Sequence, residues 1–270
     1  MNTLKSFLLL GLGLVVGSTI LVTSSTGCDQ PAPKCSSARG DYIVRYTYVS
    51  GSEACKTLIG ERVGVQTYNA VGKDQKPDLD RASVAMQAEG IGSLRDKSEE
   101  AEVPDVDPND KAYALGDFTT NTPQGNVCFV SNLTPAQQKI DAIKGDDAGT
   151  KPSPATTLGY VWGNVRFLVT AQYYGSQFSA DLTINRDGDE CRYSAQGLYP
   201  YVDCFAVDPA TGEPVVDADG NMQPDESFCA PEANPPAHPT GSGINPDFKV
   251  HCDPQLFACV LNSTTFPSIK

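Results

Sequence analysis

Alternation of apolar and polar residues with a period of two is the feature that most constrains the fold of this 270-residue chain. Residues 41–49 place four large side chains on one face of an extended strand: Tyr42, Val44, Tyr46 and Tyr48. Residues 165–173 and 178–184 alternate in the same way, and Gly175 stands between them. An Asp-Gly turn at 187–188 then leads into another strand. The sequence therefore predicts three consecutive antiparallel strands after a first strand near the N-terminus.

Further strands are predicted more weakly, and one helix is predicted. The weaker strands are 62–69, 82–91, 111–119, 126–131, 200–207 and 256–262. The helix would begin at Thr134, a good N-cap followed by Pro135, and end at Gly145. We therefore expect an all-β antiparallel barrel or sandwich with one short helix. Residues 208–248 are rich in proline and glycine and indicate a long C-terminal loop region.

The first 28 residues have the three-part pattern of an export signal. Lys5 is the only charge before Asp29, an apolar run follows, and small polar residues lead to Cys28. The apolar run, roughly 16 residues, is shorter than the span that crosses a bilayer comfortably. Ser25-Thr-Gly-Cys28 is similar to the bacterial lipobox, although Ser25 stands where leucine is usual. Plain secretion and an uncleaved anchor helix remain the alternatives.

This pattern predicts three regions along the chain. Residues 1–27 form a signal peptide that is removed, and Cys28 then carries diacylglycerol and fatty acyl chains such as palmitate. Residues 28–39 form a lipidated tether, because Pro31 and Pro33 favour extended backbone. Residues 40–270 form a single β-rich domain.

The cysteine count supports the lipid assignment. The chain has nine cysteines, an odd number for an exported protein, and acylation of Cys28 leaves eight that can form four disulfides. These candidates are Cys35, Cys55, Cys128, Cys191, Cys204, Cys229, Cys252 and Cys259. Their connectivity stays open, with Cys252–Cys259 favoured because a short loop separates the two. Zinc is disfavoured because no C-x2-C pair occurs. We expect disulfides to staple the C-terminal loop region.

Overall charge disfavours two classes of partner. The chain has 33 acidic and 20 basic residues, a net charge of −13. Because a chain this acidic repels phosphate groups, we expect no nucleic-acid partner and no binding of anionic lipid head groups through the overall charge.

Motifs for catalysis are few, and one acidic stretch suggests a cation. The only histidines are His238 and His251, and neither a G-x-S-x-G nor an H-E-x-x-H motif occurs. A hydrolase that uses two carboxylates stays open as an alternative. One acidic stretch has oxygen ligands at EF-hand-like spacing: Asp217, Asp219, Asn221 and Asp225. Its glycine comes too early and Phe228 replaces the final glutamate, so a solvated turn is the alternative to calcium.

Two segments carry a resemblance to a known group. They are Phe167–Leu182 and the stretch Gly241–Phe248, which is followed by Cys252-Asp-Pro and Cys259-Val-Leu. Over about residues 158–262, and in the lipobox, the chain resembles the uncharacterised MlpA-type lipoproteins of myxobacteria and related delta-proteobacteria. The resemblance implies a lipoprotein of the bacterial cell envelope, in the outer membrane rather than the inner. It implies no catalytic residue.

Export and anchoring without a catalytic motif favour a binding function. We expect a membrane-anchored, non-enzymatic module that binds a small ligand or a protein partner in the envelope. A structural or adhesion component and a carboxylate-dependent hydrolase are the alternatives. The membrane, reached through the lipid, and an unidentified envelope ligand or protein are the expected partners. No cofactor is expected apart from the weak calcium candidate.

Overall fold

The computed structural model describes residues 32–102, 107, 109–145, 151–233 and 240–269. The residues from Pro33 onward form one compact unit. The predicted signal peptide and Cys28 lie outside the described residues.

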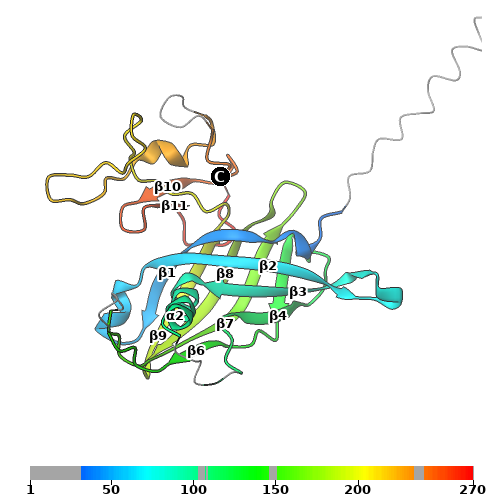
Figure 1. Cartoon of the computed structure of the whole chain (residues 1–270). Helices are drawn as coiled ribbons and strands as arrows, with labels where there is room; N and C mark the ends of the chain where they lie inside the picture. Colours follow the sequence, from blue (N-terminus) through cyan, green and yellow to red (C-terminus); the bar gives the residue numbers. More distant parts are fainter. Residues whose placement is uncertain (1–31, 103–106, 108, 146–150, 234–239, 270) are drawn as a thin grey trace, which may run out of the picture. The chain divides into compact units, whose positions relative to one another are not determined.

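Strands dominate this unit (Figure 1). They are β1 Gly40–Ser50, β2 Gly60–Val71, β3 Pro77–Ala88, β4 Ala114–Phe118, β5 Val127–Ser131, β6 Ala136–Ile140, β7 Thr156–Val169, β8 Tyr174–Arg186, β9 Asp189–Leu198, β10 Val250–Asp253 and β11 Ala258–Leu261. One α-helix, α2, spans Glu89–Glu100 in the described part. Short 3-10 helices are η1 Cys35–Ser37, η2 Glu53–Thr57, η3 Lys73–Gln75 and η4 Glu226–Cys229.

The first nine strands form one antiparallel sheet in the order β5-β4-β3-β2-β1-β9-β8-β7-β6. β5 also pairs with β7, with Cys128 opposite Phe167. The hydrogen-bonded pairings therefore run from β5 through β1 to β7 and return to β5. The predicted all-β antiparallel class is confirmed, and so are the three consecutive strands β7, β8 and β9.

Side chains fill the space that this ring of pairings encloses. Tyr42, Phe167 and Phe178 are fully buried and pack with ring centroids 5.3 to 6.2 Å apart. Trp162 joins them at 6.3 Å from Phe178. Aliphatic residues from all the long strands complete the same core, including Val44, Val63, Val84 and Leu182. Alternation places the polar residues of these strands on the outer face of the sheet.

A half-buried carboxylate, Glu61, connects α2 to the sheet. Glu61 Oε1 accepts hydrogen bonds from the hydroxyls of Tyr46 and Tyr160, each at 2.9 Å. Glu61 Oε2 accepts from the Gly90 backbone N–H at 2.6 Å, in the first turn of α2. Gly90 must be glycine because a Cβ there would lie 2.8 Å from the Tyr160 hydroxyl. Burial raises the pKa of Glu61 above its ordinary value, and these hydrogen bonds lower it only in part.

The predicted helix at Thr134–Gly145 is wrong. Residues 136–140 form β6, which pairs with β7 from Thr156 to Tyr160. Ala136, Gln138 and Ile140 are buried, whereas the residues between them are exposed. The local capping signals at Thr134 and Pro135 are overridden because pairing with β7 buries this alternating face.

The helix of this fold was not predicted, and it follows a strand that ends earlier than expected. The strand predicted at 82–91 is β3, which ends at Ala88, and α2 begins at Glu89. The strand predicted at 200–207 is also wrong, because Asp203, Phe205 and Val207 make only isolated bridges.

Four disulfides join all eight candidate cysteines. The pairs are Cys35–Cys128, Cys55–Cys191, Cys204–Cys252 and Cys229–Cys259. The favoured pair Cys252–Cys259 is wrong, although the two residues lie opposite each other in the β10–β11 hairpin. Cys252 instead bonds to Cys204, which lies just before residues 208–248, and Cys259 bonds to Cys229 within them. The expected stapling of the C-terminal region is confirmed.

The stapled C-terminal region packs against the outer face of the sheet. Ile43 of β1 and Leu198 of β9 share a buried apolar cluster with Phe248, Val260 and Leu261. This region therefore covers the β1–β9 part of the outer face and leaves the β2–β4 part to solvent.

The folded unit begins earlier than the predicted tether allows. Cys35 is fully buried and bonded to Cys128, and the compact unit starts at Pro33. Residues 33–39, predicted as the end of the tether, therefore belong to the folded unit.

Replacing Cys35 and Cys128 together with alanine should lower the free energy of unfolding by about 2–5 kcal/mol, because this disulfide closes a long loop. The two cysteines are separated by 93 positions, against 48 for Cys204–Cys252. Denaturant titration of the variant measures the loss. An unchanged midpoint would contradict a structural role for this bridge.

Glu61 should make stability depend on pH. A carboxyl whose pKa is raised by folding holds more protons in the folded state, so the free energy of unfolding falls as pH rises through the raised pKa. Glu61→Gln removes this dependence. The advantage of wild type over the variant should therefore shrink as pH rises above the ordinary pKa of a glutamate, about 4, in denaturant titrations. An advantage that grows with pH would contradict this account.

Candidate functional site

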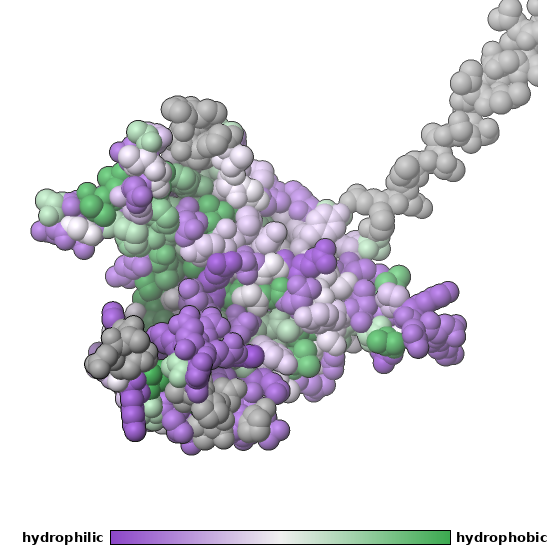
Figure 2. Space-filling view, viewed as in Figure 1, coloured by the Kyte–Doolittle hydropathy of each residue, from purple (hydrophilic) through white to green (hydrophobic). Residues whose placement is uncertain are grey.

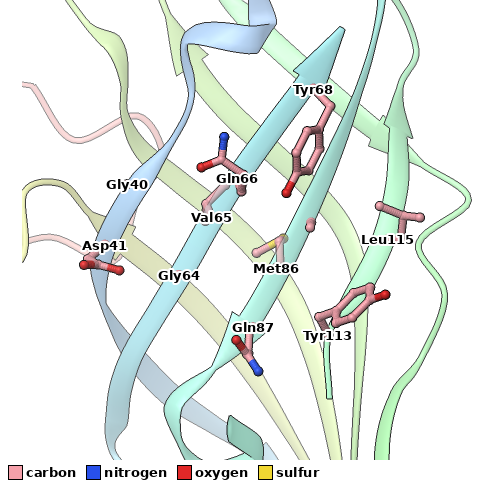
Figure 3. Close-up of a pocket in the computed structure, with 11 residues that line it drawn as sticks. Gly40, Asp41, Gly64, Val65, Gln66, Tyr68, Met86, Gln87, Tyr113 and Leu115 are labelled. Carbon is pink, nitrogen blue, oxygen red and sulfur yellow. The ribbon is translucent and has the colours of Figure 1, made fainter. Parts of the chain in front are cut away.

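A groove of about 680 Å³ lies on the exposed part of the outer face, over β2, β3 and the start of β4 (Figure 3). Its volume falls within the range of small-ligand sites. The lining residues are Gly40, Asp41, Gly64, Val65, Gln66, Tyr68, Ala85, Met86, Gln87, Tyr113 and Leu115. Val65 and Met86 are buried and contribute from beneath, whereas Tyr68 and Leu115 are 53% and 44% exposed.

Strand register builds the groove from two neighbouring rows. In the first, Gly64 of β2 lies between Asp41 of β1 and Gln87 of β3. In the second, Ala85 of β3 lies between Gln66 of β2 and Leu115 of β4. Because the small residues occupy the middle of each row, the sheet surface is lowest there.

Two tyrosines border this floor. Tyr68 follows Gln66 on the same face of β2, and Tyr113 immediately precedes β4. Figure 3 shows both rings projecting from the sheet on the groove side. A tyrosine ring presents a flat apolar face and a polar hydroxyl, so the pair can pack on a ligand and hydrogen-bond to it.

Polar groups of the groove are available to a ligand. No hydrogen bond within the described residues engages the hydroxyls of Tyr68 and Tyr113 or the side-chain amide of Gln87. Gln66 Nε2 donates only to the carbonyl of its neighbour Thr67, at 3.2 Å. The groove thus offers amide and hydroxyl donors and acceptors without a net charge.

An ion pair lies at the end of the groove that Asp41 forms. Arg62 donates to the Asp41 carboxylate, and its guanidinium lies 5.2 Å from the centre of the Tyr201 ring. The hydrogen bond to Asp41 raises the pKa of Arg62. Because the two charges satisfy each other, this end of the groove is polar but close to neutral.

Open space lies above Gly64. A Cβ built there would lie 3.7 Å from the Asp41 carboxylate and 3.9 Å from the Gln87 carbonyl, which are ordinary contacts. The backbone does not require glycine at this position, since its φ is not in the left-handed region. The missing side chain therefore deepens the groove.

Three of the four residues of the calcium candidate, Asp217, Asp219 and Asn221, lie together in a tight turn. Asp217 Oδ1 accepts from the backbone N–H groups of Asp219 and Asn221, both at 2.9 Å. The hydrogen bond from the Asn221 backbone is the main reason that the pKa of Asp217 is lowered. Asp225 lies apart from this turn, where its carboxylate caps η4 through Ser227. The calcium site stays a prediction.

Cysteine clusters and histidines add no site within the described part of the chain. The groups of three or more potential metal ligands found there are built on disulfide-bonded cysteines: Cys204, Cys229 and Cys259, and Cys55, Asp189 and Cys191. His251 Nδ1 lies 2.6 Å from Asn262 Oδ1 at the surface. His238 lies outside the described residues. No metal requirement is shown.

Sequence reasoning missed the groove, because it arises from cross-strand register. One signal was present: Gly64 interrupts the outward-facing positions of a well-formed strand, and a glycine inside a strand often marks a close approach of another molecule.

Among the residues that the structure describes, no helix has the length and apolar character needed to span a bilayer.

Comparison with known proteins places the chain in a family. The putative lipoprotein MlpA of Myxococcus xanthus is 24% identical over 251 residues, which cover 89% of this chain and 87% of the relative. No solved structure matches. The MlpA family model matches residues 40–200, which contain the nine-stranded sheet and the whole groove. The chain therefore belongs to the MlpA family of lipoproteins.

Proposed function

We propose that the mature protein is anchored to the cell envelope by lipid on Cys28 and binds a small, uncharged, polar ligand in the β2–β4 groove. The ligand class that fits best is a saccharide. The protein acts without catalysis, as a binding module. The membrane is the outer one, as the resemblance to the myxobacterial lipoproteins implies.

The binding proposal rests on one observation. Gly64 and Ala85 form a low floor in the groove, and aromatic and amide side chains border this floor. Rings such as Phe167 and Phe178 fill the middle of the interior, so we place the ligand on the outer face of the sheet. The C-terminal region covers another part of the outer face. The groove is a concave, solvent-facing surface that combines a floor of small residues with polar groups available to a ligand.

A saccharide matches the chemistry of this surface. Sugar rings have one apolar C–H face, which packs on tyrosine rings, and a rim of hydroxyls, which exchange hydrogen bonds with amides. Gln66 and Gln87 supply amides on one side, and Tyr68 and Tyr113 supply rings. A strongly anionic ligand is disfavoured, because the chain carries a net charge of −13.

Gly64→Val should weaken ligand binding without weakening the fold. The two methyl groups would fill the groove floor, and valine suits a strand better than glycine. With chito-oligosaccharide, an uncharged N-acetylglucosamine oligomer, as the probe, we expect the dissociation constant from calorimetry to rise at least about tenfold. The melting temperature should stay the same or rise.

The matched control is Gly163→Val. Gly163 faces outward on β7, and a Cβ there meets only the Asp181 side chain at 3.9 Å. This variant should bind the probe as wild type does. Equal binding by wild type and Gly64→Val, or binding by neither protein at millimolar probe, would overturn the saccharide proposal.

Anchoring is tested separately. In cells fed an alkyne-labelled fatty acid, the wild-type chain should acquire the label and fractionate with outer membranes, and Cys28→Ala should lose the label because no other thiol would be acylated. Label on both chains, or on neither, would contradict acylation at Cys28.

A further inference from the structure

The β2–β3 hairpin projects beyond the sheet and has exposed apolar residues (Figure 1). Val71 is 74% exposed, more than any other large hydrophobic side chain in the described ranges, and Leu79 is 60% exposed. Val71 lies opposite Pro77 in the strand pairing, and Leu79 is two residues further along the same strand. Val71 and Pro77 are therefore direct cross-strand neighbours, and Leu79 follows in the irregular stretch between the Ala70–Asp78 and Asn69–Ala82 pairs. The three exposed apolar residues are close to one another along the hairpin. Figure 2 shows hydrophobic and hydrophilic residues side by side on this hairpin.

The first residues of the folded unit are fixed to the base of this hairpin. Asn121 is 1% exposed and connects the two parts. Its side-chain oxygen accepts from the Ser36 backbone N–H at 2.9 Å, and its side-chain nitrogen donates to the Leu79 carbonyl at 2.8 Å. Thr67 Oγ1 adds a hydrogen bond to the Ser36 carbonyl at 2.6 Å. The chain therefore enters the fold at the end from which the hairpin projects.

Chain lengths bring the hairpin within reach of the anchor. From Cys28 to Pro33 the backbone has five steps, which span at most about 18 Å when extended. β2 ends at Val71, and the tip beyond it is the short 3-10 helix Lys73–Gln75, so the hairpin advances less from Asn69 to Asp74 than five extended residues would. A lipid at Cys28 holds Pro33, near the base of the hairpin, within about 18 Å of the acylated residue, so the hairpin lies beside the bilayer.

Charge at the tip suits an anionic surface. Lys73 and Lys76 form no ion pair in the part of the chain that the structure describes, and Asp74 lies between them. Arg81 pairs with Asp78, and Lys34 pairs with Asp80. The hairpin as a whole has three basic and three acidic residues, but its tip at 72–77 has two lysines against one aspartate. The tip is therefore a small, locally positive exception in a chain whose net charge of −13 disfavours anionic surfaces. Lysines near anionic head groups are attracted to them.

From these observations we infer that the β2–β3 hairpin is a membrane-contact element, whose exposed apolar residues Val71, Pro77 and Leu79 enter the interface of an anionic phospholipid bilayer. This inference rests on the proposed acylation of Cys28. Contact through two aliphatic side chains is weak by itself, but the lipid keeps the hairpin at a high effective concentration beside the bilayer. The contact would fix the orientation of the domain on its membrane.

Tryptophan placed on the hairpin reports this contact. The chain has one native tryptophan, Trp162, which is 3% exposed in the core and gives a constant background. The acylated, full mature chain carrying Val71→Trp is reconstituted into phosphatidylglycerol-containing vesicles with brominated acyl chains. We expect quenching of the added fluorescence and a blue shift of its emission. Replacing Lys73 and Lys76 with glutamine in the same chain should reduce both effects.

Val49→Trp is the matched control, because Val49 is 61% exposed near the other end of β1. Its fluorescence should be unchanged by brominated lipid. Flotation of the protein with the vesicles is measured first. A chain that does not float contradicts the anchoring proposal. If both chains float, but the Val71→Trp and Val49→Trp variants show the same fluorescence response, the hairpin inference is overturned.

Two further outcomes also decide the inference. A blue shift that depends on protein concentration without quenching would mean that the hairpin contacts a second copy of the chain, which overturns it. Equal quenching in zwitterionic and anionic vesicles would overturn the role of the two lysines.

Discussion

The pairing of β5 with β7 is the constraint on which the rest of this structure depends. It joins Val127–Phe129 of β5 to Arg166–Leu168 of β7. The series of hydrogen-bonded strands that begins at β5 therefore comes back to β5. The inward faces of the long strands must then share one interior, and large rings such as Tyr42, Phe167 and Phe178 fill it. Rings packed in this way leave no room for a ligand among them. We therefore propose recognition on the outer face, where the C-terminal region covers one part and the groove lies on another.

Much of the fold follows from sequence, because alternation is a local signal. Tyr42 to Tyr48 and Phe178 to Ile184 each have apolar residues on one face, and both are strands. The helix could not be located in the same way. Thr134 and Pro135 give good local capping signals, but pairing with β7 decides the state of residues 136–140. Conversely, α2 contains two glycines and buries only Ile91 and Ser98, so its sequence shows little of a helical face. Disulfide connectivity was also beyond reach, because Cys252 and Cys259 are neighbours in a hairpin yet bond elsewhere.

Less of the candidate site could be predicted. The groove depends on the register that sets Gly64 beside Asp41 and Gln87, and Ala85 beside Gln66 and Leu115. A shift of one residue in β2 would put Val65 on the surface and bury Gln66. Because the pairings of all the strands together fix this register, the register could not be predicted from the sequence. The outward-facing Gly64 was the one sequence signal for the groove. The residues chosen from sequence for calcium, Asp217 and Asn221, hydrogen-bond to each other in a turn. Their pattern reflects turn chemistry as well as ligand spacing.

The central claim, that recognition occurs on the outer face over β2–β4, is tested most directly by mapping amide chemical shifts in the mature chain during titration with envelope saccharides. The account predicts that the largest changes fall on Gly64, Gln66, Ala85, Gln87 and Leu115, and that amides of the filled core, such as that of Phe178, stay unchanged. Changes concentrated in the C-terminal region, or within the core, would contradict it.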